Sequence, residues 1–354
     1  MLEGVGGTGL TVAGIRAAET ERADRLFADP LAASFVAAAG SPPSQATGRQ
    51  AAALRLWIVA RTVFLDELVL GACAEGTRQV VLLGAGFDTR AFRLPWPPEV
   101  RCFELDTPDV LASKEQVLTA QHAVPGCARI TVPGDLRDDW PAALREAGLR
   151  LDEPTAWVAE GLLVYLSPND VDQLLDRVTS LSAPGSRLGL TFRSRTPGDQ
   201  TPPAVALRQS AAPDDPVGWL AGHGWAAQLT GAREVLRAHG RAVPAASPSQ
   251  AGRQSRALLI SAALDPGLAR ARPAERRTRP ASAAPRPHLV AQPGAVSAMD
   301  RPLQITCCPA GRLGHMPPWR RPWRARRTLI RKMILPAVKA SSVRRRHKRS
   351  LTRC

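Results

Sequence analysis

Residues 80–90 read VVLLGAGFDTR, and residues 103–106 read FELD. The first stretch is an apolar run of strand length that enters a glycine turn, and the second is a short strand that ends in acid. In an open α/β sheet a nucleotide-like cofactor lies at such a place, because glycines let the backbone approach it and the acid accepts hydrogen bonds from ribose hydroxyls. The two stretches therefore predict an α/β fold with a cofactor site.

The identity of the cofactor depends on positions 88 and 89. The dinucleotide fingerprint has a third glycine at position 89, where this chain has Thr89. It also holds a phosphate at the N-terminus of the following helix, where Asp88 would place a negative charge. Both departures count against NAD and favour S-adenosylmethionine (SAM), which has a ribose but no phosphate.

Strands and helices alternate along the rest of the chain up to residue 264, which is typical of a mostly parallel sheet with helices on both faces. Helical patterns precede the first strand, and the clearest of them covers residues 50–74. A later helix is expected over residues 171–181, with Asn169 or Asp170 as its N-cap. The predicted strands cover residues 80–83, 101–105, 130–132, 155–159, 187–192, 224–230 and 256–263.

Charge is very unevenly distributed along the chain. Residues 1–264 hold 25 Lys and Arg against 28 Asp and Glu, a formal net charge of −3, whereas residues 265–354 hold 22 against 3, a net charge of +19. The second segment is rich in Pro, Arg, Ala and Ser and has no sustained periodicity, which is typical of disorder. We therefore expect one domain over 1–264, with a helical cap over 1–75, and a basic tail over 265–354.

Composition also excludes several classes of protein. The six cysteines show no metal or disulfide pattern, which favours free thiols in a reducing compartment. No stretch approaches the roughly 20 apolar residues that span a bilayer, and the N-terminus lacks the pattern of a signal peptide. The expectation is a cytoplasmic protein without a metal or a membrane contact.

Several motifs, taken together in their order and spacing, resemble the leucine carboxyl methyltransferase-like family of SAM-dependent methyltransferases, in particular its bacterial branch. The resemblance covers about residues 8–264. It implies a doubly wound, mostly parallel Rossmann-like sheet of seven strands in the order 3-2-1-4-5-7-6, with a reversed last strand and extra N-terminal helices that close over the cofactor. The motifs are TVAGIRAAET (11–20), LFADPLA (26–32), ART (60–62) ahead of Asp66, LLGAGFDTRAFRL (82–94), FELDTP (103–108), VPGDL (132–136) and AEGLLVYL (159–166).

The resemblance also implies which residues bind SAM. Gly84 and Gly86 would let the chain turn beneath the methionine part, although both could serve only a tight turn. Asp106 would accept hydrogen bonds from the ribose hydroxyls. Glu104 could share that role, because residues two apart on a strand point the same way and the sequence alone does not separate them.

Further contacts come from the N-terminal helices and from the third strand. Arg61 resembles an arginine that binds the methionine carboxylate, and Arg16 resembles a second basic contact. Asp135 and Leu136 resemble the pair that brackets adenine, with a carboxylate for the exocyclic amine and an apolar contact with the ring. The ordinary alternatives are a solvated helix face for Arg61 and a turn or helix cap for Asp135.

Glu160 and Tyr165 are the candidate catalytic residues. Glu160 follows the fourth strand, at the edge where ligands sit, and resembles a family glutamate near the SAM amine and methyl group; the alternative is a loop acid. Tyr165 lies one turn further and would line the acceptor pocket, although a place in the core is the more ordinary one. His122, His223 and His239 show no partner pattern and are expected to be surface or core residues.

These residues predict a methyltransferase that acts on a small molecule. Methyl transfer from a sulfonium is an in-line displacement that needs alignment more than acid–base chemistry. A carboxylate acceptor is already ionised at neutral pH, whereas a hydroxyl needs a base, and no His–Asp pair is evident for that role. The prediction is therefore O-methylation of a carboxylate or hydroxyl, with the carboxylate favoured and with residues 193–218 as much of the lid.

An alternative prediction assigns function to the basic tail. A segment of this charge would attract nucleic acid or another anionic surface by counterion release, and Trp319 and Trp323 between arginines could add stacking. A third possibility is that the tail has no function, because its abrupt change of composition resembles translated non-coding sequence.

Overall fold

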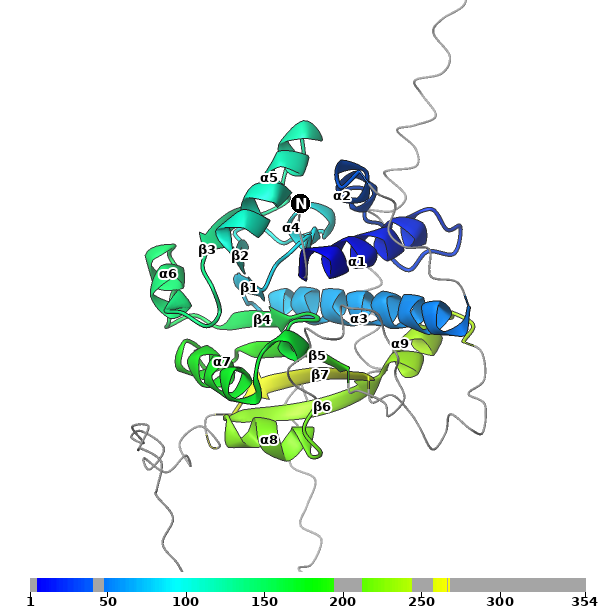
Figure 1. The fold of residues 1–354 in the computed structure, drawn as a ribbon. Helices are drawn as coiled ribbons and strands as arrows, with labels where there is room; N and C mark the ends of the chain where they lie inside the picture. Colours follow the sequence, from blue (N-terminus) through cyan, green and yellow to red (C-terminus); the bar gives the residue numbers. More distant parts are fainter. Residues whose placement is uncertain (1–4, 41–47, 194–211, 244–256, 266, 268–354) are drawn as a thin grey trace, which may run out of the picture. The chain divides into compact units, whose positions relative to one another are not determined.

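The computed structural model describes residues 5–40, 48–193, 212–243, 257–265 and 267 of the chain (Figure 1). Within these residues the strands are β1 (Gln79–Leu83), β2 (Arg101–Asp106), β3 (Ala128–Pro133), β4 (Thr155–Ala159), β5 (Arg187–Arg193), β6 (Trp225–Gly231) and β7 (Ala257–Leu264). They form one sheet in the order β3-β2-β1-β4-β5-β7-β6, and β7 is antiparallel to both of its neighbours. The predicted fold class, including the strand order and the reversed last strand, is confirmed.

Helices precede and separate these strands. The described ones are α1 (Val5–Thr20), α2 (Ala32–Ala38), α3 (Arg49–Ala74), α4 (Arg90–Arg93), α5 (Pro108–Ala120), α6 (Trp140–Glu146), the 3₁₀ helix η1 (Leu163–Tyr165), α7 (Pro168–Ser180), α8 (Pro216–Gly222) and α9 (Ala232–Ala238).

The sequence of β1 explains its central place in the sheet. All five of its residues are buried, and the strand pairs in parallel with β2 on one side and β4 on the other. A strand covered on both faces and paired at both edges needs apolar side chains at nearly every position. The run Val80–Leu83 supplies them.

The register of these three strands defines one edge of the sheet. Leu83, the last residue of β1, is level with Leu105 in β2 and with Ala159 in β4. β2 lies on one side of β1 and β4 lies on the other, so the direction in which the sheet grows reverses at β1. Open α/β sheets bind ligands at such a switch point. The residues that follow the three level positions are Gly84, Asp106 and Glu160.

Helices cover both faces of the sheet. On one face α6, α7 and α8 contribute to a large apolar cluster that includes Phe103, Trp157 and Trp225. On the other face α3 passes so close to β5 that a Cβ on Gly189 would lie 2.6 Å from Cδ2 of Leu65. Gly189 therefore permits the close approach of α3 to the sheet.

The N-terminal helices pack against the glycine loop, which we define as residues 84–88. The ring of Phe87 stacks on Phe35 of α2 with centroids 4.9 Å apart, and both join Ala13 of α1 in one buried cluster. Nη2 of Arg16 donates a hydrogen bond to the carbonyl oxygen of Phe87 at 2.5 Å. The helices expected ahead of the first strand thus hold the loop that follows it.

Three local features differ from the sequence-based expectations. The N-cap of α7 is Ser167, in a capping box with Asp170, so the expected cap at Asn169 or Asp170 is wrong. The short helices α4 and η1 were not predicted. Their four and three residues are too few to show a helical period.

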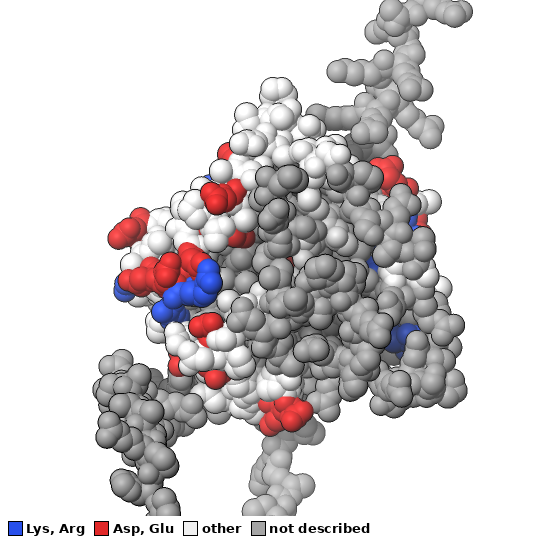
Figure 2. All heavy atoms as spheres, in the orientation of Figure 1, with Lys and Arg blue, Asp and Glu red and all other residues white. Residues whose placement is uncertain are grey.

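The surface of the described residues carries both signs of charge. On the face shown in Figure 2, red acidic and blue basic side chains of these residues lie beside one another, without an extended basic patch among them. No helix within the described ranges is long and apolar enough to cross a membrane. The predicted tail, apart from Asp265 and Gly267, and the lid positions 194–211 lie outside the described residues.

Candidate functional site

The glycine loop turns back onto the acid end of β2. Gly84 and Gly86 have φ angles of +62° and +44°, a left-handed conformation that favours glycine. The N–H of Gly86 donates to Oδ2 of Asp106 at 2.7 Å, and the N–H of Thr107 donates to Oδ1 at the same distance. The turn and the acid found in the sequence are therefore joined directly.

Asp106 keeps the capacity to accept further hydrogen bonds. Each carboxylate oxygen has more than one acceptor site, and each carries one backbone N–H here. Burial raises the pKa of Asp106, and the N–H groups of Gly86 and Thr107 oppose that rise. The side chain is only partly buried, so it can meet a bound hydroxyl group.

Glu104 lies two residues before Asp106 in β2 and has a different environment. Its side chain is 0 % exposed, and its Oε2 pairs with Nζ of Lys114 at 2.8 Å and with Nη2 of Arg129 at 2.9 Å. Two cations from α5 and β3 thus hold this carboxylate inside the molecule. The sequence left Glu104 and Asp106 as alternatives, and only Asp106 is partly exposed at the edge.

Arg61 of α3 meets Glu160 beside the end of β4. Nε of Arg61 donates to Oε1 of Glu160 at 2.8 Å, whereas Nη1 and Nη2 make no hydrogen bond to any described residue. The guanidinium lies against Gly161, where a Cβ would be 3.0 Å from Nη1 and where φ is +63°. Among the described residues the arginine therefore keeps its two NH2 groups for an external acceptor.

Glu160 has a second cationic partner. Nη1 of Arg90 donates to its Oε2 at 2.7 Å, so both carboxylate oxygens are engaged by arginines. Burial acts to raise the pKa of Glu160, but the charges of Arg90, Arg61 and Arg16 outweigh burial and lower this pKa to about 2. Glu160 is therefore a carboxylate anion at neutral pH.

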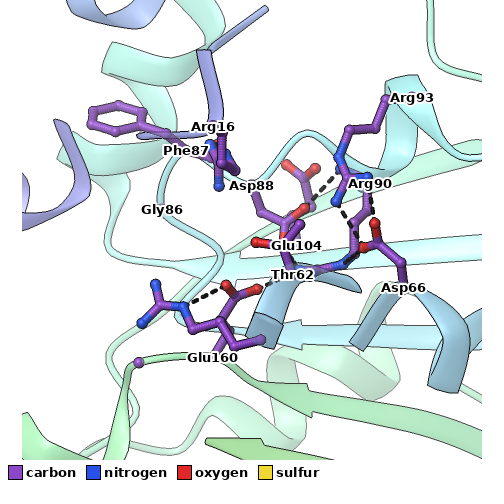
Figure 3. Close-up of polar contacts among 12 residues, drawn as sticks. Arg16, Thr62, Asp66, Gly86, Phe87, Asp88, Arg90, Arg93, Glu104 and Glu160 are labelled. Atoms are coloured by element: carbon purple, nitrogen blue, oxygen red, sulfur yellow. Dashed lines mark hydrogen bonds and ion pairs between the residues drawn. The ribbon is translucent and has the colours of Figure 1, made fainter. Parts of the chain in front are cut away.

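Arg90 belongs to a buried cluster of ion pairs that sequence reasoning did not find (Figure 3). Its Nε lies 2.8 Å from Oδ1 of Asp66 in α3, its Nη1 also pairs with Asp88, and Arg93 binds Asp66 through both end nitrogens at 2.6 and 2.7 Å. Burial acts to lower the pKa of Arg90, but the carboxylates of Asp88, Glu160 and Asp66 raise it well above its ordinary value. The only sign of this cluster in the sequence is that Arg90 lies within the motif at 82–94 and that Asp66 follows the motif at 60–62.

Asp88 lies just before the N-cap of α4. In a dinucleotide-binding fold a phosphate would lie at this helix terminus. Oδ1 of Asp88 accepts the N–H of Arg90, the first residue of that helix, at 2.7 Å. The side chain is buried, and Arg90 contributes most to the lowering of its pKa, against the opposing effect of burial. This helix terminus therefore already carries an anion of the chain itself.

The predicted adenine contacts lie after β3. Asp135 accepts hydrogen bonds from Nε and Nη2 of Arg137 at 2.9 and 2.5 Å, and this partner lowers its pKa. Arg137 is largely exposed, so its hold on Asp135 is the weak kind typical of surface ion pairs. Leu136 packs against the large apolar cluster.

Arg16 has a carboxylate partner of its own, and Tyr165 packs against the apolar core. Arg16 is buried, with its Nε 2.9 Å from Oδ2 of Asp29 in addition to its bond to Phe87. It acts on Glu160 as one of the charges that lower its pKa. Tyr165 ends η1 and packs against the large apolar cluster, in keeping with the ordinary alternative of a core residue.

His223 and His239, for which the sequence shows no partner pattern, both have acidic partners in the structure. Nδ1 of His223 lies 2.6 Å from Asp176 and its Nε2 3.2 Å from Asp172, while His239 pairs with Glu67 at 3.0 Å. The two aspartates are four residues apart and so share one face of α7. The contact therefore joins two elements that sequence analysis had treated separately.

The His–Asp pair nevertheless lies away from the glycine loop. His223 precedes β6, whose first residue Trp225 is level with Leu264, and the N–H of Leu264 donates to Ser186 just before β5 begins. This is the amino edge of the parallel strands, opposite the edge that carries Asp106 and Glu160. Within the described part of the chain, no group of three or more His, Cys, Asp or Glu side chains could hold a metal ion.

Comparisons with known proteins find relatives among methyltransferases. The model of the family described as leucine carboxyl methyltransferase matches residues 9–179. A protein of Streptomyces coelicolor, provisionally named an S-adenosyl-L-methionine-dependent methyltransferase, is 51% identical over 251 residues, covering 67% of this chain and 89% of that protein. A similarly named protein of Frankia alni is 49% identical over 261 residues, covering 70% of this chain and 91% of its own. The crystal structure of a duf574 family protein from Streptomyces avermitilis matches with a TM-score of 0.45 at 17% identity, covering 72% of this chain and 97% of that one.

Proposed function

The chain belongs to the leucine carboxyl methyltransferase family and is a SAM-dependent methyltransferase, and from this premise we propose that it methylates a carboxylate oxygen of a small molecule. The enzyme class and the cofactor predicted from the sequence are confirmed by the relatives. The acceptor, the methylated atom and the roles of individual residues are the proposal.

The residues at the carboxyl edge fit the groups of SAM. Asp106 has acceptor capacity left for ribose hydroxyls, and Arg61 has two NH2 groups, Nη1 and Nη2, that no described residue engages and that suit the methionine carboxylate. Each carboxylate oxygen of Glu160 accepts one hydrogen bond from an arginine. Each oxygen has a further acceptor site that can bind an ammonium group. In this assignment Gly84 and Gly86 form the floor of the site.

Asp135 and Leu136 complete the assignment at the adenine end. Leu136 offers an apolar surface next to the large cluster, and Asp135 can exchange its exposed partner Arg137 for an exocyclic amine. An exposed ion pair contributes little free energy, so the exchange costs little.

The ionised state of Glu160 carries the proposal about the acceptor. A general base is most effective when its pKa lies near the working pH. The arginines instead lower the pKa of Glu160 to about 2. The described His–Asp pair lies at the opposite edge of the sheet. Among the described residues at this edge, Glu160 thus orients and balances charge and does not remove protons.

An acceptor that arrives already ionised suits such a site. When bound, SAM supplies a methyl group activated by its sulfonium, which an acceptor oxygen can take by in-line displacement. A carboxylate has no proton to lose in that step, whereas a hydroxyl must lose one. We therefore favour a carboxylate, and the residues of the chain have only to align donor and acceptor.

The chemical stability of the product tests this proposal. The full-length protein is incubated with methyl-labelled SAM and either a panel of small carboxylic acids or a matched panel of phenols and alcohols. We expect label to enter the carboxylic acids as methyl esters, which release labelled methanol in mild base. Label found only in base-stable products would contradict carboxylate methylation, while leaving the methyltransferase class intact.

A further inference from the structure

Arg90 is enclosed, yet it touches carboxylates from three separate parts of the chain (Figure 3). Its side chain is 1 % exposed and pairs with Asp66 of α3, Asp88 of the glycine loop and Glu160 after β4. A side chain so completely covered cannot meet a molecule bound at the edge of the sheet. Any effect of Arg90 on such a molecule must pass through the carboxylates that it holds.

We propose that Arg90 is a positioning residue for the SAM site: it fixes Glu160 as a charged carboxylate, which in turn presents Arg61 to the methionine end of SAM. The inference rests on the proposed roles of Glu160 and Arg61. It adds a residue that is covered by the chain itself and that has no role in the sequence-based prediction.

The geometry of Glu160 carries this inference. One oxygen accepts from Nε of Arg61 at 2.8 Å, and the other accepts from Nη1 of Arg90 at 2.7 Å. A carboxylate with a single partner can still rotate about its terminal bond, whereas two charge-assisted bonds on opposite oxygens fix its plane. Because Arg61 uses only Nε in this contact, the orientation of Glu160 decides where its end nitrogens point.

The charges around Glu160 predict how the loss of Arg90 would be felt. Arg61 of α3, Arg90 of α4 and Arg16 of α1 favour its ionised form, while burial and the negative charge of Asp88 oppose it. Of the three arginines, Arg90 lowers the pKa of Glu160 the most. Without it, burial is less opposed and the pKa of Glu160 rises. As pH falls through the raised pKa, Glu160 takes up a proton and loses its hold on Arg61 and on an ammonium group.

The pH dependence of SAM affinity tests the inference. The dissociation constant of SAM is measured by calorimetry between about pH 5 and about pH 8 for the full-length wild type and for Arg90→Gln. We expect the ratio of the two constants to grow as pH falls, approaching roughly tenfold per pH unit once the pH lies below the raised pKa of Glu160. The ratio cancels the pH dependence that both proteins share, which comes from the titration of Asp106 and of the amino group of SAM.

Arg93→Gln is the matched control. Arg93 lies in the same short helix, has a side chain that is only 5 % exposed and binds Asp66 through both end nitrogens, but it makes no hydrogen bond to Glu160. Its ratio to wild type should therefore stay level across the pH range. A level ratio for Arg90→Gln, or an equal slope for both variants, would overturn the inference.

Two further variants keep the test decisive if Arg90→Gln fails to fold. Arg90→Lys keeps a positive charge, and its profile should lie between those of wild type and the glutamine variant. The pair Arg90→Gln with Asp88→Asn removes one charge of each sign from the cluster, and its ratio should still slope, but from a lower pH than in Arg90→Gln because the opposing charge of Asp88 is also gone. Level ratios in both would reject the role of Arg90, whereas a wild type that does not bind SAM would instead reject the proposed site.

Discussion

At the scale of single residues, the position of the Arg61 guanidinium depends on the lack of a side chain at position 161. A Cβ on Gly161 would lie 3.0 Å from Nη1 and 3.4 Å from Cζ of Arg61. The loop cannot simply move away, because the N–H of Gly161 donates to Oγ1 of Thr191 at 2.7 Å. Gly161→Ala should therefore displace the guanidinium and raise the dissociation constant of SAM about tenfold, or about 1.4 kcal/mol.

Gly240→Ala is the control for this prediction. Gly240 has a similar left-handed φ of +74°, but nothing lies within 4 Å of the position that a Cβ would take. Both variants should lose stability, by about 1–2 kcal/mol, because alanine is disfavoured in that conformation. Only Gly161→Ala should lose affinity in calorimetry, and equal affinities would show that the contact with Arg61 is unimportant.

Sequence reasoning at this scale identified side chains better than their partners. Glu104 and Asp106 share one side of a strand, and their difference comes from Lys114 and Arg129, which only the fold brings beside Glu104. Arg90 has no periodicity or spacing that marks a buried arginine. Its role depends on an ion pair with Glu160, seventy positions later in the chain.

At the scale of elements, the packing of α3 on β5 sets a steric limit. Gly189→Ala would place its Cβ 2.6 Å from Leu65 and 3.2 Å from Leu68. Overpacking of this kind typically costs about 1–3 kcal/mol. Urea unfolding should therefore show a loss of stability in that range, with a smaller loss when Leu65→Ala is added to make room.

Gly71→Ala in the same helix should have the opposite effect. Gly71 lies inside α3, and nothing lies within 4 Å of the position of its missing Cβ. Alanine in a helix interior is favoured over glycine by about 0.5–1 kcal/mol. If Gly71→Ala destabilised the protein as much as Gly189→Ala, the explanation by steric overlap would be wrong.

The elements themselves were largely predictable. The limits of β4 match the expected range, and those of α3 differ from theirs by one residue, since a short buried apolar run and a long helical period are strong local signals. The limits of α4 were not predictable, because four residues are too few to show a helical period and its two arginines are held by ion pairs that only the fold brings together. The N-cap of α7 was missed because two neighbouring residues could also cap a helix.

At the scale of the whole molecule, the candidate site and the basic segment occupy different parts of the sequence. All residues assigned to SAM lie between Arg16 and Glu160 in the sequence, and the last described strand ends at Leu264. The N–H of Asp265 still donates to Gly224, and the N–H of Gly267 to Asp265. A chain cut after Gly267 retains these contacts and should bind SAM with the affinity of the full-length protein.

The same truncation distinguishes the alternative function of the tail. If residues 268–354 bind nucleic acid, the full-length protein should bind a DNA duplex with an affinity that falls steeply as salt increases, and the truncated protein should not. A truncated protein that loses SAM affinity would contradict the separation of the two parts. Equal DNA binding by both would remove the tail as the binding segment.

The strand order and the cofactor could be predicted because they follow from motif order and from a resemblance spread over most of residues 8–264. The ionic environment could not. The pKa of Glu160 depends on arginines from α1, α3 and α4, and the sequence does not say that these three converge on one carboxylate. That convergence keeps Glu160 ionised, which is why a carboxylate acceptor is proposed.

The glycine loop is held from two sides, with a consequence for how affinity can be tuned. Asp106 binds the N–H of Gly86 on one side, and on the other Arg16 and Phe35 hold Phe87. Two events that share one loop are thermodynamically linked, and linkage is reciprocal. A substitution that loosens α1 from Phe87 would weaken the donor site by the same free energy with which bound SAM would tighten α1. Helices far upstream in the sequence would thus serve as a remote adjustment of methyl-donor affinity.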